Sequence, residues 1–312
     1  MPMIRINAKG DTPVLHATPG ILDARLTRVG QERTGPVVVM IHGYKYLPGH
    51  PLHCPHRHIM SLQPQEKPWR ATSWPRQLGF DAGHADEGLA IAFGWDARGA
   101  LRQAQSRAVQ AGQALARVCA ALHDQAPDRP IHIIAHSMGS EVAAEALHHL
   151  PASAIGRIIS MTGASYRSRV RAALDTPAGS RAEFINVTSR ENDLFDFLYE
   201  RLIPAPQPGD RAIGHGLSAP NAVTLQLDCA GTLDHLERLG APIATPQRRI
   251  CHWSSYTRPG VLQFYKDLLR RPQALPLSAL RNGLPTAPAP RWSRLMARPG
   301  WPDLTDAAQR AG

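Results

Sequence analysis

The stretch that most constrains the fold runs from Ile131 to Ser140, where a short apolar run meets an abrupt change of pattern. The apolar run is typical of a strand buried on both faces of a parallel sheet. A helical pattern begins directly after it, near Gly139, and its apolar residues fall on one face: Val142, Ala143, Ala146, Leu147 and Leu150. The stretch therefore predicts a strand, a tight turn with Ser137 at its apex, and a helix.

Small residues flank Ser137 where such a turn needs them. The backbone turns so sharply that the residues two before and two after the serine must be small, and here they are Ala135 and Gly139. The serine hydroxyl then stands exposed above the edge of the sheet. The segment Ala135-His136-Ser137-Met138-Gly139 thus has the pattern of a nucleophile elbow.

A second motif lies upstream, where the pair His42-Gly43 follows the apolar run from Val37 to Ile41. With these two motifs the chain resembles the α/β-hydrolase superfamily over roughly residues 31–270. It differs from the usual elbow at Ala135, which replaces a glycine. The resemblance implies an α/β-hydrolase fold, in which a mostly parallel central sheet carries helices on both faces.

The rest of the chain alternates strands and helices, as parallel crossovers require. We expect strands at 89–95, 157–161, 183–187 and 222–228, a long helix over 101–122 and a closing helix over 261–269. The domain organisation expected is a set of lead-in strands in 1–30, an α/β-hydrolase domain over 31–271 with an insertion at about 45–88, and a Pro/Arg-rich flexible tail over 272–312.

The net charge of +10 raises the question of nucleic-acid binding. Of the 35 basic residues 31 are arginine, and they are spread along the chain rather than clustered, which argues against a phosphate-binding surface. No apolar run approaches 18 residues, so membrane insertion is not expected. The four cysteines form no Cys-x-x-Cys pair, and free buried thiols in a reducing compartment favour a cytoplasmic protein. The sequence carries no sign of the oligomeric state.

The insertion is rich in histidine, with His50, His53, His56 and His58 around Cys54. One interpretation is a metal site, because His56 and His58 would project from one face of an extended segment. No pair has the spacing of a zinc finger, however. A lid or pocket wall over the carboxyl edge of the sheet is the favoured interpretation.

The resemblance also assigns catalytic roles, in the chain order serine, acid, histidine. A serine hydroxyl is a poor nucleophile at neutral pH, so it needs a histidine base that an acid holds in the right tautomer. Asp193 is the expected acid, because it lies in the polar turn after the strand that ends near Val187. Glu191 and Asp196 are alternatives, and a solvated loop carboxylate is the competing interpretation.

For the base, three histidines follow the expected acid. His252 lies between the last strand and the last helix, where the resemblance places the base, and it is the preferred candidate. His215, in a glycine-flanked loop before the last strand, is the alternative. His235 lies in a helical pattern, where a surface histidine is the ordinary expectation.

Two backbone N–H groups are expected to form the oxyanion hole, those of Met138 and Tyr44. Gly43 would let the backbone approach closely. His42 and His136 are expected to serve in packing rather than in catalysis. The apolar run over 194–203 fits either a cap that lines an acyl pocket or an ordinary core helix.

These expectations together describe a serine hydrolase that cleaves a small-molecule carboxylic ester, thioester or amide through an acyl-enzyme. The ester is the default by analogy within the superfamily. This chemistry needs no cofactor and no metal. An acyltransferase on the same triad and a catalytically silent, hydrolase-like binding protein are the alternatives, and a nucleic-acid-associated protein would show binding that weakens steeply with salt.

Overall fold

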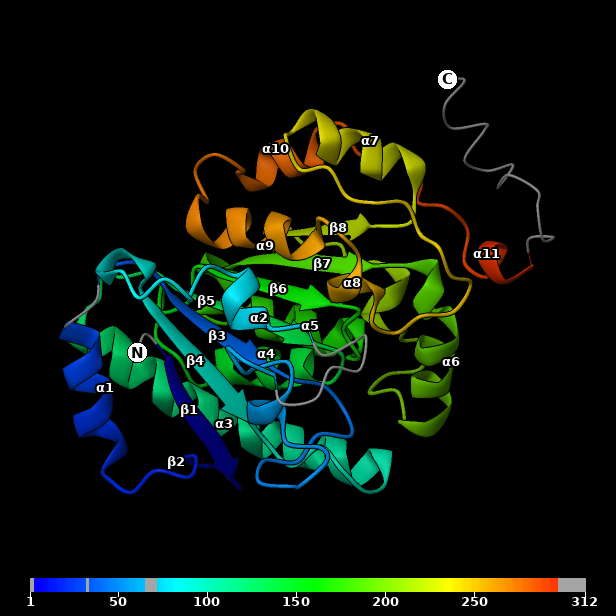
Figure 1. The fold of residues 1–312 in the computed structure, drawn as a ribbon. Helices are drawn as coiled ribbons and strands as arrows, with labels where there is room; N and C mark the ends of the chain where they lie inside the picture. The colour runs from blue at the N-terminus through cyan, green and yellow to red at the C-terminus, as the bar shows by residue number, and fades with distance from the viewer. Residues whose placement is uncertain (1–2, 32–33, 65–71, 297–312) are drawn as a thin grey trace.

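An eight-stranded sheet runs through the middle of the molecule (Figure 1). The structure is a computed structural model, and it describes residues 3–31, 34–64 and 72–296. The strand order is β2-β1-β4-β3-β5-β6-β7-β8, and every neighbouring pair is parallel except β1 and β2. The strands are β1 Met3–Lys9, β2 Thr12–Leu15, β3 Val37–Ile41, β4 Leu89–Gly94, β5 Ile131–His136, β6 Arg157–Met161, β7 Glu183–Thr188 and β8 Ala222–Gln226. The expected α/β fold with a mostly parallel sheet is confirmed.

The central strands are apolar throughout because both faces of the sheet are covered. In β3, Val37, Val39 and Ile41 face one core cluster, while Val38 and Met40 face the other. All five residues are buried. A strand with this environment reads as a continuous apolar run rather than an alternating one, which is why the sequence marks it so clearly.

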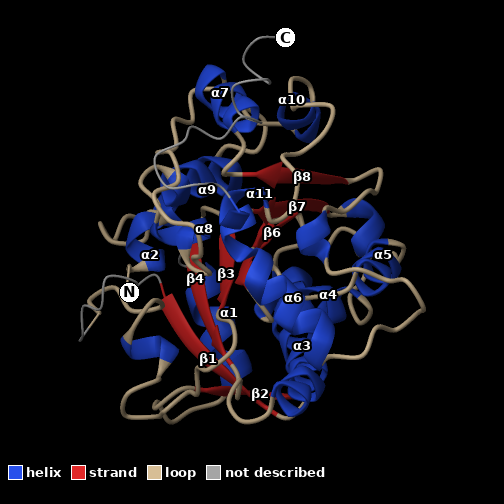
Figure 2. Cartoon of the chain, turned by 90° about the vertical axis from the view of Figure 1, so that its right-hand side faces the viewer, coloured by secondary structure: helices blue, strands red, loops and turns tan. Residues whose placement is uncertain are grey.

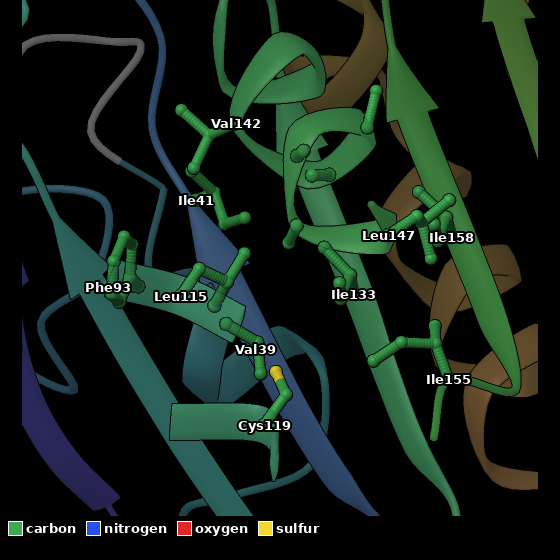
Figure 3. Close-up of a cluster of buried hydrophobic side chains, with 14 of the residues drawn as sticks. Val39, Ile41, Phe93, Leu115, Cys119, Ile133, Val142, Leu147, Ile155 and Ile158 are labelled. Atoms are coloured by element: carbon green, nitrogen blue, oxygen red, sulfur yellow. The ribbon is translucent and has the colours of Figure 1, made fainter. Parts of the chain in front are cut away.

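Helices cover both faces, as the view in Figure 2 shows. One layer contains α1 Leu22–Gln31, α3 Leu101–Gln125, α4 Gly139–Leu147 and α5 Arg167–Leu174. The other layer contains α2 Trp74–Gln77, α7 Ala230–Arg238, α8 Ser254–Thr257, α9 Val261–Arg270 and α10 Leu277–Arg281. In the first layer, side chains from α3 and α4 interdigitate with those of the central strands (Figure 3). Gly112 permits α3 to pack closely against α4, because a Cβ there would lie 2.5 Å from Glu145 of α4.

Helix α6, Asp193–Leu202, begins directly after the short 3₁₀ turn Arg190–Asn192 that follows β7. It presents Asp193, Asp196 and Tyr199 to the interior and leaves Phe197, Leu198 and Leu202 partly exposed. Helix α6 is therefore neither fully buried, as a core helix would be, nor fully exposed, as an external cap would be. The position matters because its first turn lies next to the candidate site.

The insertion is built into the second helical layer over much of its described length. Trp74, Leu78 and Phe80 are buried in the same core cluster as α9. Its other described elements are the 3₁₀ turns Pro55–Arg57 and Ala85–Glu87. Residues 65–71 of the insertion lie outside the described residues.

Near the N-terminus the expected lead-in strands are present, whereas the described part of the C-terminal stretch is more ordered than the sequence led us to expect. β1 pairs in parallel with β4, so the lead-in strands extend the main sheet. Residues 272–296, expected to belong to a flexible tail, instead contain α10 and α11, Ser293–Met296, and bury Leu277, Leu280 and Ala289. The remainder of the expected tail, 297–312, lies outside the described residues. Among the described helices, none has the length and apolar character needed to cross a bilayer.

Candidate active site

Ser137 occupies the tight turn between β5 and α4. Its φ is +54°, a left-handed conformation that is strained for a residue with a side chain. Three backbone hydrogen bonds hold the turn: Ser137 N–H donates to Met161 O at 3.0 Å, and Ser137 O accepts from Ala164 N–H at 2.9 Å and from Ser140 N–H at 3.0 Å. The surrounding fold therefore over-determines this conformation, as is usual where strain serves a function.

Two glycines allow the loop after β3 to press against this turn. A Cβ on Gly43 would lie 2.7 Å from Ser137 Cβ and 2.9 Å from His136 O. A Cβ on Gly139 would lie 2.8 Å from His42 O. No real side chain fits at those distances, so glycine is required at both positions for the two strand ends to meet.

His42 is a structural residue of the β3 loop. Its side chain is completely buried and stacks on Trp95, with ring centroids 5.7 Å apart and planes at 7°. Its Nδ1–H donates to Gly43 O at 2.9 Å, and its Nε2 accepts Trp95 N–H at 3.0 Å. Burial lowers the pKa of His42 to about 4, so the ring is neutral and shaped for packing.

His252 lies in the loop before α8 and is held at three points. Its Nδ1 is 2.6 Å from Asn192 Oδ1, which accepts the Nδ1–H. Its carbonyl accepts a hydrogen bond from His136 Nε2–H at 3.0 Å and one from Thr162 Oγ1 at 3.3 Å. Phe195 stacks on the ring at a centroid distance of 4.6 Å. With Nδ1 occupied in this way, Nε2 carries the lone pair.

His136, the residue before Ser137, contacts His252. The rings of His136 and His252 have centroids 4.6 Å apart, and His136 also contacts the edges of Trp74 and Tyr256. Burial lowers the pKa of His136 to about 4, and burial together with His136 lowers the pKa of His252 well below its ordinary value. Both rings are therefore neutral at neutral pH, which is the state in which His252 Nε2 can accept a proton.

The partner of His252 Nδ1 is Asn192 rather than a carboxylate. Asn192 is the last residue of the 3₁₀ turn after β7 and is buried. Its Nδ2 donates to Asp196 Oδ1 at 2.9 Å. The amide thus bridges His252 to a buried carboxylate one helical turn further along the chain.

The comparisons with known proteins agree with this architecture. Residues 22–164, which contain β3, β4 and the elbow after β5, match the family model described as "Alpha/beta hydrolase of unknown function (DUF900)". The chain therefore has an α/β-hydrolase fold, and residues 22–164 match an α/β-hydrolase family. The resemblance expected from the sequence is confirmed.

Two solved structures of acetyl xylan esterase are similar to the chain. The one determined at 0.90 Å resolution is 15% identical, with a TM-score of 0.32; the match covers 48% of this chain and 82% of that one. The other, an iodinated complex, is 14% identical, with a TM-score of 0.31; the match covers 48% of this chain and 81% of that one. No curated protein matches the sequence.

Within this α/β-hydrolase fold, the expected acid Asp193 faces away from His252. Its Oδ1 is 2.6 Å from Arg291 Nε, and its Oδ2 accepts the N–H of Trp292 at 2.5 Å. The contact with His252 belongs to the preceding residue, Asn192. Asn192 is not among the residues expected from the sequence, since a carboxylate is the usual partner of the histidine, although it directly precedes Asp193.

The alternative acids and bases also have other partners. Glu191 forms a buried ion pair with Arg258, and Asp196 reaches His252 only through Asn192. His215 pairs with Glu200 at 3.2 Å, with its pKa lowered to about 4, first by burial. His235 is buried in α7 and hydrogen bonds to Ala279 O, so the expectation of a surface histidine is wrong.

The two expected oxyanion-hole donors lie where the β3 and β5 loops meet. Within residues 3–31, 34–64 and 72–296, neither Met138 N–H nor Tyr44 N–H has a hydrogen-bond acceptor. Met138 is at the N-cap of α4, where the helix leaves its first N–H groups without internal partners. Both groups are thus available for an external acceptor.

The histidine-rich part of the insertion holds its rings in pairs. His50 and His53 have ring centroids 4.8 Å apart, and His56 and His16 are 4.2 Å apart. His56 Nε2 hydrogen bonds to Asn7 Oδ1 at 2.7 Å, which ties the insertion to β1. The described residues contain no group of three or more side chains arranged to hold a metal ion. All four cysteines are free and buried.

Proposed function

We propose that the chain is a serine hydrolase that cleaves a small carboxylic ester, or a related thioester or amide, through an acyl-enzyme. Ser137 is the nucleophile and His252 the general base. Asn192 takes the orienting position that the sequence analysis gave to Asp193. The observation that carries the proposal is the hydrogen bond between His252 Nδ1 and Asn192 Oδ1, with the ring of His252 4.6 Å from that of His136, the residue before a serine at φ +54°.

The reaction follows from these positions. Ser137 Oγ attacks the carbonyl carbon, and its proton passes to His252 Nε2. The N–H groups of Met138 and Tyr44 stabilise the oxygen anion of the tetrahedral intermediate, an effect typically worth about 3 kcal/mol per donor. His252 then gives the proton to the leaving alcohol, and the acyl group stays on Ser137. Water, deprotonated by His252, attacks the acyl-enzyme; the bond between the acyl carbon and Ser137 Oγ then breaks, His252 returns the proton to Oγ, and the acid leaves.

Asn192 can do part of what a carboxylate does. Its Oδ1 accepts Nδ1–H and so fixes the tautomer of His252, but it brings no negative charge to stabilise the imidazolium. His252 also lies in an environment that disfavours the charged ring. We therefore expect slower turnover than a triad with a direct carboxylate would give.

A fluorophosphonate probe tests this proposal without knowledge of the substrate, because it labels only an activated serine. Wild-type protein should be labelled, and Ser137→Ala should abolish the label. His252→Ala and Asn192→Ala should lower the rate constant of labelling, the latter by about 100-fold, since His252 loses its fixed tautomer.

Ser140→Ala is the matched control. Ser140 is a completely buried serine in the first turn of α4, and its hydroxyl shares a hydrogen bond of 2.9 Å with the hydroxyl of Ser160. Its removal should leave labelling unchanged. An absence of labelling in folded wild-type protein would contradict the proposal and favour a catalytically silent binding protein.

A further inference from the structure

A continuous chain of side-chain contacts links His252 to the C-terminal segment, which we define as residues 289–296. His252 Nδ1 contacts Asn192 Oδ1 at 2.6 Å, and Asn192 Nδ2 contacts Asp196 Oδ1 at 2.9 Å. The other oxygen of Asp196 is 3.1 Å from Arg291 Nη1. Arg291 is 95 residues from Asp196 in sequence. His252 is thus connected, through Asn192 and Asp196, to the guanidinium of Arg291 in the C-terminal segment.

The orientation of the Asn192 amide depends on the charge of Asp196. An ionised carboxylate only accepts hydrogen bonds, so it requires Nδ2 on its side and leaves Oδ1 for His252. A protonated carboxyl can donate, which permits the amide to turn over and present Nδ2 to His252. In that orientation Nδ1 would have to accept, the proton would sit on Nε2, and the ring would be the wrong tautomer for a base.

Asp196 is buried deeply enough for its charge to depend on its neighbours. It is 3% exposed, and a Cβ on Gly214 would lie 2.0 Å from its Oδ2. Burial raises its pKa to about 7, Arg291 opposes that rise, and Asp193 and Glu200 add to it. His215 faces Glu200 and is kept neutral by burial. Arg291 is therefore the cation that favours the ionised form.

The C-terminal segment is seated by contacts on both sides of Arg291. Ala289 exchanges two hydrogen bonds with the side chain of Gln226 in β8, at 2.7 and 3.0 Å. Trp292 N–H donates to Asp193 at 2.5 Å, and its ring meets the edge of Phe197. Arg294 pairs with Asp228 at 2.9 Å. These contacts give the Arg291 guanidinium one position.

We propose that Asp196 and Arg291 are positioning residues for the general base, acting through Asn192, and that the C-terminal segment thereby completes the active site. This inference rests on the proposed function. Neither residue touches the substrate. They set the tautomer of His252, and the activity therefore depends on the C-terminal segment, which lies far from the elbow in the sequence.

The rate constant of fluorophosphonate labelling as a function of pH tests this. In wild type it should fall as the pH drops through about 7, where Asp196 takes up a proton. Arg291→Gln removes the opposing cation, so the fall should move to higher pH by about one unit or more, with about tenfold slower labelling at neutral pH and recovery near pH 9. Arg291→Lys should restore most of the wild-type profile.

Arg238→Gln is the matched control, because it removes the same charge at an exposed position in the last turn of α7 without touching Asp196 or the C-terminal segment. Its profile should match wild type. Asp196→Asn cannot titrate, so the pH dependence near 7 should disappear while labelling stays slow at every pH. If Arg291→Gln is too unstable to study, Arg291→Lys and Asp196→Asn carry the test, with thermal unfolding as the check on folding.

The outcomes separate the two proposals. Labelled wild type with Arg291→Gln and Asp196→Asn both following the Arg238→Gln profile would overturn the positioning role and leave the serine hydrolase intact. Unlabelled wild type would overturn both.

Discussion

The candidate site consists of two regions that are built in different ways. The serine region, made by Gly43, Ser137 and Gly139, is held by backbone hydrogen bonds and by glycines at close contacts. The base region, made by Asn192, Asp196, His252 and Arg291, is held by side-chain hydrogen bonds and buried charges. The geometry of the serine region therefore depends on steric fit, and the geometry of the base region depends on the protonation states of its side chains.

The steric character of the serine region is tested by Gly43→Val. The first added carbon alone would lie 2.7 Å from Ser137 Cβ and 3.0 Å from His136 Nδ1, so the turn has to move. We expect labelling by the fluorophosphonate probe to be lost and the free energy of unfolding to fall by about 2–3 kcal/mol, as for overpacked cores. Labelling kinetics and urea unfolding measure the two effects.

Gly209→Ala controls for the loss of a glycine as such. Its φ is +76° and nothing lies within 4 Å of the added Cβ, so only backbone strain of about 1–2 kcal/mol is expected. Labelling should stay at the wild-type rate. Normal labelling of Gly43→Val would show that the two loops need not approach closely.

The electrostatic character of the base region is tested at its anchor, Asp228. This carboxylate follows β8 and pairs with Arg190 at 2.8 Å, both side chains being completely buried, and Arg190 begins the turn that carries Asn192. Asp228→Asn leaves the Arg190 charge without its counterion. A loss of about 3–5 kcal/mol in the free energy of unfolding is expected, measured by urea denaturation.

An exposed ion pair supplies the comparison. Asp11 and Arg117 are 2.6 Å apart but about half exposed, so Asp11→Asn should cost less than about 1 kcal/mol. Equal losses in the two variants would mean that burial does not distinguish these pairs. The base region would then be held by packing rather than by charge.

The contrast between the regions also explains what the sequence could predict. The strands were readable because parallel strands covered on both faces are continuous apolar runs, and the turn at Ser137 was readable because its small residues are neighbours in sequence. α5 was missed because its arginines, at 167, 169 and 171, mask a narrow buried stripe of Val170, Ala173 and Leu174.

The base region was only partly predictable, for a physical reason. His252 could be proposed as the base from its place between the strand expected at 222–228 and the helix expected at 261–269. The choice between Asn192 and Asp193 depends on which side chain Arg291 draws away, and that contact joins residues about a hundred positions apart. The segment that supplies Arg291 is rich in proline and arginine, which resembles a disordered tail in composition although it packs against β8.

Asp196 of the base region and the buried histidines beside the serine region should respond to pH in opposite directions. Asp196 has a raised pKa in the folded protein, so its contribution to stability is present below the pKa of the unfolded chain and is lost as the pH rises through about 7. His42 and His136 have lowered values of about 4. Their contribution is present above the unfolded pKa and is lost as the pH falls from about 6.5 toward 4.

His132, at the start of β5, allows the effect of a buried histidine on acid stability to be measured away from the candidate site. It is 2% exposed, its Nδ1 accepts Arg157 N–H at 3.0 Å, and burial lowers its pKa to about 4. His132→Asn keeps an acceptor but cannot titrate. Between about pH 6.5 and 4, the unfolded wild type takes up one proton more than the folded state, so wild type should lose about 2 kcal/mol relative to the variant. Urea unfolding at several pH values across this window measures the difference.

His148→Asn is the control, because His148 lies at an exposed position directly after α4. This variant should keep the wild-type dependence of stability on pH. If His132→Asn also leaves that dependence unchanged, the buried ring of His132 does not destabilise the fold in acid, and the lowered pKa assigned to it is contradicted.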